Sequence, residues 1–163
     1  MTRHEYQLTP EDYRSSGLRL PAGLIVRQPT VDDRLELAFL MMDAYVGTID
    51  YDGETEDQAL EEVDGYLGKE ALLDLSVVAI LDDAIQSAVL LSNVLGLPLV
   101  GYAMTRAAMK GQGLASALLD VAVTAVWESG AEELRAFITA GNTPSEKIFE
   151  RTGFKVIGTY GEE

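Results

Sequence analysis

The chain has 163 residues, of which 12 are basic and 27 acidic, so its formal net charge at pH 7 is −15. Such a charge repels nucleic acid and anionic membranes, and no apolar run reaches the ~18 residues that a transmembrane helix needs. The chain has no cysteine and its N-terminal residues are polar, so we expect a cytoplasmic protein without disulfides, thiol nucleophiles or a metal centre.

Residues 1–22 show no clear hydrophobic period, and we expect them to form an N-terminal arm ahead of one domain over 23–163. The later elements follow from apolar periodicity, turn residues and helix caps. In chain order they are a strand at 24–27, a helix at 32–46, a loop at 46–53, an acidic helix at 54–67, strands at 75–81 and 86–93 joined as a hairpin, a strand at 97–105, a helix at 114–129, a strand at 133–140, a helix from 143 to 152 and a last strand from 154.

The most informative stretch is the short glycine turn between the strand at 97–105 and the helix at 114–129, which reads Lys110-Gly111-Gln112-Gly113. Glycines let the backbone approach a ligand closely, and the first N–H groups of a helix point outward without partners. The helix dipole adds positive charge there, so the turn predicts a phosphate or pyrophosphate site. The alternative is a turn that joins strand to helix and binds nothing.

The spacing of this turn excludes the two common phosphate loops. No lysine followed by serine or threonine closes it, as G-x-x-x-x-G-K-[ST] requires. Gly111 and Gly113 are followed by Ser116, where G-x-G-x-x-G requires a third glycine.

A second segment, from Asn142 to Phe154, follows the strand at 133–140. Asn142 or Thr143 can cap a helix, and Pro144 suits the first turn of one. Gly153 ends this helix before the final strand.

Together the two segments resemble the hallmarks of the GNAT N-acetyltransferase superfamily. Lys110 to Ala115 fits the acyl-CoA loop [RQ]-x-x-G-x-[GA], with lysine in the basic or polar first position, and Asn142 to Phe154 resembles N-x-x-[AS]-x-x-[hydrophobic]-[YF]-E-[KR]-x-G-F. The resemblance implies a mixed α/β (α+β) fold: a mostly antiparallel sheet with one parallel, splayed strand pair, flanked by helices. The chain ends just after the sixth strand of the family, so a seventh is missing or supplied otherwise.

The resemblance also implies that acetyl-CoA lies where the parallel strands splay apart. Its pyrophosphate would meet the glycine turn, its pantetheine arm would pair with residues 102–105, and backbone N–H groups near Met104 or Thr105 would bind the oxyanion. The expected cofactor-binding residues are Met104, Thr105, Lys110, Gly111, Gln112, Gly113, Leu114, Ala115, Ser116, Asn142, Ser145 and Phe149.

The usual proton donor for the leaving thiolate is absent from its usual place, because Phe149 stands where many members of the family place a tyrosine. By residue type the catalytic candidates are Tyr51, Tyr102 and Ser145, although a general acid is dispensable for a thiolate leaving group. For the acceptor we expect Tyr45, Asp50, Asp52 and Glu54, whose acidic members can bind an ammonium. The alternative is that these acids only cap the next helix.

Three functions are compatible with the sequence. The first is direct, acetyl-CoA-dependent transfer to a primary amine of a small molecule or peptide, by a protein that binds no nucleic acid or membrane and is compatible with a homodimer. The second is a non-catalytic acyl-CoA-binding or regulatory module on the same fold, which Phe149 favours. The third is an interaction domain that binds no CoA, because fold alone does not determine function.

Overall fold

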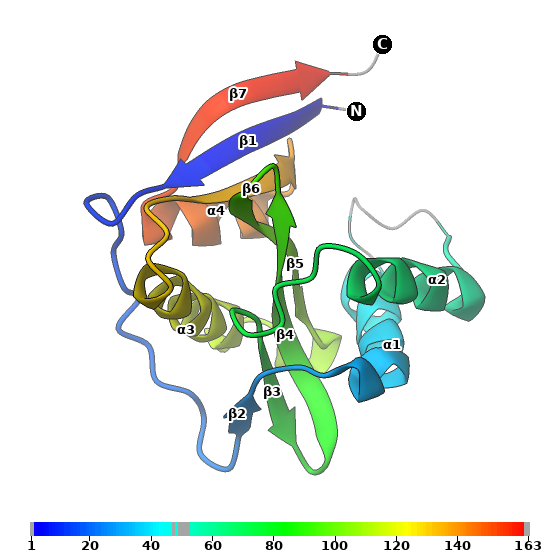
Figure 1. The fold of residues 1–163 in the computed structure, drawn as a ribbon. Coiled ribbons are helices and arrows are strands. Elements are labelled where there is room, and N and C mark those ends of the chain that lie inside the picture. The colour runs from blue at the N-terminus through cyan, green and yellow to red at the C-terminus, as the bar shows by residue number, and fades with distance from the viewer. Residues whose placement is uncertain (1, 47, 49–52, 162–163) are drawn as a thin grey trace.

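The computed structural model describes residues 2–46, 48 and 53–161, and its central feature is one seven-stranded mixed sheet (Figure 1). The spatial order of the strands is β2-β3-β4-β5-β6-β1-β7. The strands are β1 Thr2–Leu8, β2 Ile25–Arg27, β3 Val77–Leu81, β4 Ala84–Val94, β5 Leu97–Thr105, β6 Leu134–Thr139 and β7 Lys155–Gly161. The helices are α1 Arg34–Tyr45, α2 Glu56–Leu67, α3 Leu114–Glu128 and α4 Thr143–Thr152, with 3-10 turns at Val31–Asp33 and Ala107–Met109.

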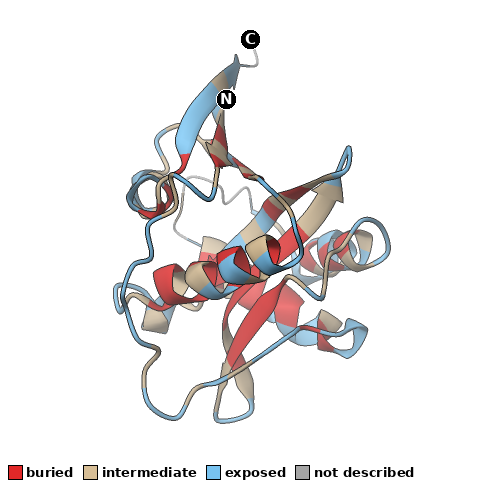
Figure 2. Ribbon diagram, turned by 60° about the vertical axis from the view of Figure 1, so that its left-hand side comes forward, coloured by how far each residue is buried: buried red, intermediate tan, exposed pale blue. Residues whose placement is uncertain are grey.

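Helices cover both faces of the central strands, so two apolar clusters form. Val78, Ala88, Leu90 and Met104 point toward α1 and α2. Side chains of alternate residues on the same strands point toward α3, among them Val77, Ala79, Val89 and Leu91. Because both faces are covered, β3 and β4 read as nearly continuous apolar runs. Figure 2 shows the buried residues concentrated where the helices lie against these strands.

The N-terminal residues differ from the expected arm, because Thr2–Leu8 form a strand inside the sheet. β1 pairs antiparallel with β6 on one side and with β7 on the other (Figure 1). Its Tyr6 and Leu8 are 1% and 0% exposed. The expectation of a loose arm is therefore wrong for these residues, and β1 supplies the seventh strand that the C-terminal part of the chain lacks. Residues 9–22 contain no helix or strand.

Most of the other elements match their predicted positions. β5 has the predicted bounds, and α3 begins at Leu114 as predicted. The β3–β4 hairpin turns at Asp82 and Asp83, whose φ angles of 52° and 62° suit a two-residue turn of the hairpin type. α2 begins two residues later than predicted because Thr55 caps it, in a reciprocal capping box with Gln58.

Candidate active site

The parallel strands β5 and β6 separate soon after they begin. They pair only at Leu99–Arg135 and Val100–Ala136, whereas β5 continues to Thr105 and β6 to Thr139. A cavity of about 330 Å³ occupies the opening between them. It is lined by Arg3, Tyr45, Leu99, Val100, Gly101, Tyr102, Ala103, Ala136, Phe137, Ile138, Thr139, Asn142, Ser145 and Phe149. We refer to this opening as the strand slot.

A β-bulge at Gly101 accompanies the separation. Leu90 faces Tyr102 and the next residue, Leu91, faces Val100, so Gly101 is the extra residue of β5. A bulge bends its strand and redirects the side chains beside it. A Cβ at Gly101 would lie only 3.2 Å from Ser92 Oγ, so glycine suits this position sterically.

The backbone of β5 beyond the bulge offers alternate residues to the slot. The Arg106 N–H donates to the Gln86 carbonyl on β4, and the Met104 carbonyl accepts from Ser87 Oγ, also on β4. Because backbone groups alternate in direction along a strand, those of Ala103 and Thr105 face β6. Of residues 103–105, Ala103 lines the slot. Binding of the oxyanion by N–H groups near Met104 or Thr105 stays a prediction.

The glycine turn has the geometry that an anion needs. Gly111 and Gly113 have φ angles of +81° and +78°, which favour glycine, and no side chain caps α3. The first helical bond runs from the Ala117 N–H to the Gly113 carbonyl, so the N–H groups of the three residues before Ala117 have no partner within the helix. Those three are Leu114, Ala115 and Ser116. The side chains of Leu114 and Ser116 are buried. A contact of these two residues with a ligand would therefore be made by their backbone N–H groups.

Lys110 is engaged away from this turn. Its Nζ donates to the Ala44 carbonyl at 2.7 Å, in the last turn of α1. An ammonium stabilises the unpaired carbonyls at a helix C-terminus. In this arrangement Lys110 joins the glycine turn to α1, and its predicted contact with phosphate stays a prediction.

The N-terminal end of α4 forms another wall of the slot. Asn142 is the residue before the helix and makes no side-chain cap, while Ser145 and Phe149 lie one and two turns further along. Phe149 is 5% exposed and its ring packs against Phe154, with the ring centres 4.8 Å apart. A phenyl ring cannot donate a proton, so Ser145 carries the hydroxyl on this wall.

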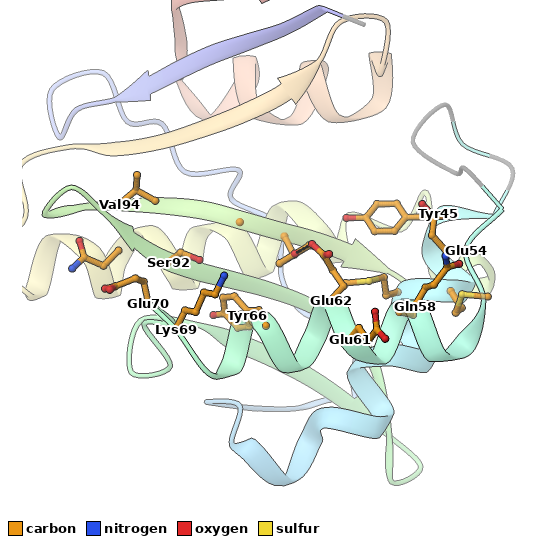
Figure 3. Close-up of a pocket in the computed structure, with 17 residues that line it drawn as sticks. Tyr45, Glu54, Gln58, Glu61, Glu62, Tyr66, Lys69, Glu70, Ser92 and Val94 are labelled. Carbon is orange, nitrogen blue, oxygen red and sulfur yellow. Dashed lines mark hydrogen bonds between the residues drawn. The ribbon is translucent and has the colours of Figure 1, made fainter. Parts of the chain in front are cut away.

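A second cavity, of about 1070 Å³, lies between α2 and the strands β4 and β5 (Figure 3). It is lined by Met41, Met42, Tyr45, Glu54, Gln58, Ala59, Glu61, Glu62, Gly65, Tyr66, Lys69, Glu70, Ser92, Asn93, Val94, Gly101 and Tyr102. We call it the acidic cleft, because four carboxylates and one ammonium line it. Tyr45, Gly101 and Tyr102 line both the cleft and the slot, so the two cavities meet there.

The predicted acceptor and catalytic residues are only partly brought together. Tyr45, Tyr102 and Glu54 line the cleft, whereas Asp50, Tyr51 and Asp52 lie outside the described residues. The Tyr102 hydroxyl donates to the Glu62 carboxylate. Burial, with the hydrogen bond and charge of Glu62, raises the pKa of Tyr102 well above its ordinary value. In this arrangement Tyr102 keeps its proton and directs it toward the cleft.

Sequence reasoning missed Glu62, one of several acids on an acidic helix. The available signal was spacing: Gln58, Glu62 and Tyr66 recur every four residues and so share a face of α2. Figure 3 shows Glu62 and Tyr66 on the face of α2 that is turned toward β4 and β5, with Lys69 in the turn that follows the helix. Tyr66 fixes this face, because its hydroxyl donates to the Leu91 carbonyl at 2.7 Å.

The structure combines a mixed sheet that has a splayed parallel pair, a glycine turn without a side-chain cap at the start of a helix, and an adjoining cleft. This combination is typical of proteins that bind an elongated anion beside a second ligand. A family model described as "Acetyltransferase (GNAT) domain" matches residues 23–155. The chain belongs to the GNAT acetyltransferase family, as its two sequence segments predicted. A search of curated proteins gave no significant match.

Solved structures share this fold at low identity. A GCN5-related N-acetyltransferase from Sphaerobacter thermophilus is 18% identical with a TM-score of 0.75, over 98% of this chain and 49% of that one. The PaiA N-acetyltransferase from Thermoplasma acidophilum, in complex with coenzyme A, is 17% identical with a TM-score of 0.67, over 85% and 93%. A GNAT acetyltransferase from Brucella melitensis, in complex with acetyl-CoA, is 20% identical with a TM-score of 0.64, over 83% and 88%. The chain thus spans about half the length of the first of these.

Within the described residues, no helix is long and apolar enough to cross a bilayer. Over the same residues, histidine and carboxylate side chains form no group of three or more that could hold a metal ion.

Proposed function

We propose that this protein transfers an acetyl group from acetyl-CoA directly to a primary amine of a small molecule or peptide. The observation that carries the proposal is the meeting of the two cavities at Tyr45, Gly101 and Tyr102. A donor held in the strand slot and an acceptor held in the acidic cleft would have their reacting ends at this junction. Holding two reactants together in this way supplies a large part of the catalysis of a bimolecular transfer.

The slot and the turn fit acetyl-CoA chemically. The N–H groups at the start of α3 and the left-handed glycines suit a pyrophosphate, and no atom lies within 4 Å of where a Cβ of Gly111 would be. The backbone of Ala103 and Thr105 would pair with the amide groups of the pantetheine arm. Gly111 to Ser116, with Asn142, Ser145 and Phe149, would complete the site, and Lys110 would place the turn.

Bound acetyl-CoA would supply a thioester. Attack by the neutral amine would form a bond from its nitrogen to the carbonyl carbon and break the carbon–sulfur bond, with the nitrogen losing a proton to solvent and the sulfur leaving as the thiolate of coenzyme A. The protein contributes position and charge stabilisation. N–H donors of the bulged strand would face the developing oxyanion. Ser145 and Phe149 would border the sulfur, with Ser145 holding a water. Direct transfer suits a chain without cysteine, because no thiol can carry the acyl group.

The second candidate is a non-catalytic acyl-CoA-binding module. Two observations favour it: Phe149 provides no proton at the α4 wall, and the Tyr102 hydroxyl is engaged with Glu62. Both candidates predict cofactor binding, whereas an interaction domain predicts none. A net charge of −15 further supports a cytoplasmic protein that binds neither nucleic acid nor membranes.

Two measurements test the proposal. Calorimetric titration with acetyl-CoA and with desulfo-CoA should show micromolar binding of both, and a folded protein that binds neither at millimolar concentration would contradict the cofactor site. Thiol release from acetyl-CoA in the presence of a panel of primary amines then separates the two candidates. Binding of acetyl-CoA without amine-dependent thiol release across the panel would favour the non-catalytic module.

A further inference from the structure

We propose that Glu62 binds the ammonium group of the acceptor, that Tyr102 positions the Glu62 carboxylate for this, and that the acceptor is a cationic amine that carries no carboxylate. This inference rests on the proposed function, because it assigns the acidic cleft as the acceptor side of the same site. It names a substrate-binding residue that the sequence did not indicate.

The first argument for the proposal is that Glu62 lies beside the place where the two cavities meet. Glu62 lines the cleft, and the hydroxyl that it accepts from belongs to Tyr102, which lines both cavities. Tyr102 directly follows the bulge residue Gly101, where β5 turns away from β6. A carboxylate held by Tyr102 is therefore held at the junction, where an attacking nitrogen would have to arrive. An ammonium bound there would lose one proton to solvent before its nitrogen attacks.

The second argument is that no basic side chain of the described residues pairs with the Glu62 carboxylate. The described residues provide it with no arginine or lysine at salt-bridge distance, and the hydroxyl that it accepts from is neutral. Its negative charge therefore remains available to a cation. By contrast, Asp64 on the same helix is paired with Arg34 at 2.6 Å and lies outside the cleft lining. A carboxylate accepts strong, charge-assisted hydrogen bonds from an ammonium.

Tyr102 has the properties of a positioning residue. Its ring is held edge-on against Tyr66, with the ring centres 5.7 Å apart, and Tyr66 is itself fixed to Leu91. Because burial and Glu62 raise the pKa of Tyr102, the hydroxyl stays a donor at all pH values at which the enzyme would work. A carboxylate oxygen has room for the ammonium as well as for this hydroxyl.

The rest of the cleft determines the kind of acceptor. Among the described residues, Glu54, Glu61 and Glu70 also line it and Lys69 is the one cation there, so a negative charge on the acceptor would be repelled. A second positive charge would be attracted. The volume of about 1070 Å³ leaves room for a body much larger than a simple alkylamine.

The test uses three amines of equal chain length: 1,5-diaminopentane, 5-amino-1-pentanol and 5-aminopentanoate. Each is titrated calorimetrically into the full chain saturated with desulfo-CoA, so that binding is measured without turnover. We expect the affinity to fall in that order, and Glu62→Gln to weaken diamine binding by about tenfold, as for loss of one charge-assisted hydrogen bond. The matched control is Glu56→Gln, which removes the same charge from the same helix outside the cleft lining.

A double-mutant cycle separates positioning by Tyr102 from a purely structural role. Tyr102→Phe should weaken diamine binding several-fold in the native chain but leave it unchanged when Glu62 is already Gln, because the hydroxyl acts through that carboxylate. Equal losses in both backgrounds would overturn the positioning role. Diamine binding that is unchanged in Glu62→Gln, or 5-aminopentanoate binding as tightly as the diamine, would overturn the inference.

Failure of the proposed function gives a different result. A protein that does not bind desulfo-CoA contradicts the cofactor site, and the diamine titration into the ligand-free protein still tests the cleft. A protein that binds desulfo-CoA but no cationic amine contradicts the acceptor assignment alone.

Discussion

The ammonium of Lys110 donates to the carbonyl of Ala44 across 2.7 Å, and so joins the glycine turn to the last turn of α1. The two residues are 66 positions apart in the chain. The contact places the turn relative to α1, whose Tyr45 lines both cavities. The site thus depends on a lysine that the sequence suggested for direct contact with phosphate.

Replacing Lys110 with methionine separates these roles. If Nζ only anchors the turn, Lys110→Met should lower the free energy of unfolding by about 1 kcal/mol, as for one hydrogen bond, and leave the salt dependence of acetyl-CoA affinity unchanged. Urea denaturation and calorimetry at two ionic strengths measure both quantities. A weaker salt dependence in the variant would instead assign Lys110 to a phosphate.

The glycine turn can be tested with a pair of matched glycines. Gly111 and Gly130, near opposite ends of α3, have φ angles of +81° and +91° and no atom within 4 Å of an added Cβ. Alanine at either position should destabilise the fold by about 1 kcal/mol through the left-handed backbone. Only Gly111→Ala should also weaken acetyl-CoA binding, since its methyl group would enter the anion site. Equal affinities of the two variants would contradict the turn assignment.

Phe149→Tyr restores a hydroxyl to the α4 wall of the slot. If transfer is limited by protonation of the leaving thiolate, kcat should rise several-fold while the KM for acetyl-CoA changes little. Phe154→Tyr is the control, because Phe154 packs against Phe149 but does not line the slot. An unchanged kcat in Phe149→Tyr, with the fold intact, would show that another donor, or none, suffices.

The stability of the fold should depend on pH through Asp33. The hydrogen bond from Arg27 lowers the pKa of Asp33, and the Thr30 N–H contributes in the same direction. A carboxyl whose pKa is lower in the folded state stabilises the fold above its unfolded pKa, and this contribution is lost as the pH falls through the folded pKa. Asp33→Asn should therefore lower the free energy of unfolding by about 2 kcal/mol at pH 7, and by progressively less below about pH 4. Urea denaturation of the native chain and of Asp33→Asn across this pH range measures the difference in their free energies of unfolding. A difference that does not change with pH would exclude stabilisation by the Asp33 charge.

The C-terminal half of the fold could be predicted because its signals are local. The bounds of β5 and the start of α3 follow from apolar runs and a glycine turn, and α4 ends at Gly153, which has a φ of 109°. The prediction that the glycine turn binds an anion rests on equally local signals.

The parts that were missed depend on contacts between distant segments. β1 alternates His4, Tyr6 and Leu8 with Arg3, Glu5 and Gln7, but its partners lie in β6 and β7 at the other end of the chain. Seven alternating residues alone did not distinguish a strand from an arm. Glu62 likewise accepts its hydrogen bond from Tyr102, 40 residues away, and Lys110 donates to Ala44, so neither contact could be read from neighbouring residues.

The place of β1 also bears on how the chain can be rearranged. Thr2 is paired with Gly161, so the two ends of the described chain lie side by side in the sheet (Figure 1). A short linker between them would convert β7 and β1 into an ordinary hairpin, and new ends could be opened among residues 9–22 without breaking a strand. Such a circular permutant would keep every strand pairing while changing the order of synthesis. The native order leaves β1, which precedes the other strands of this sheet in the chain, without neighbours until β6 and β7 have been synthesised, whereas the permutant would add it last, onto a sheet already formed.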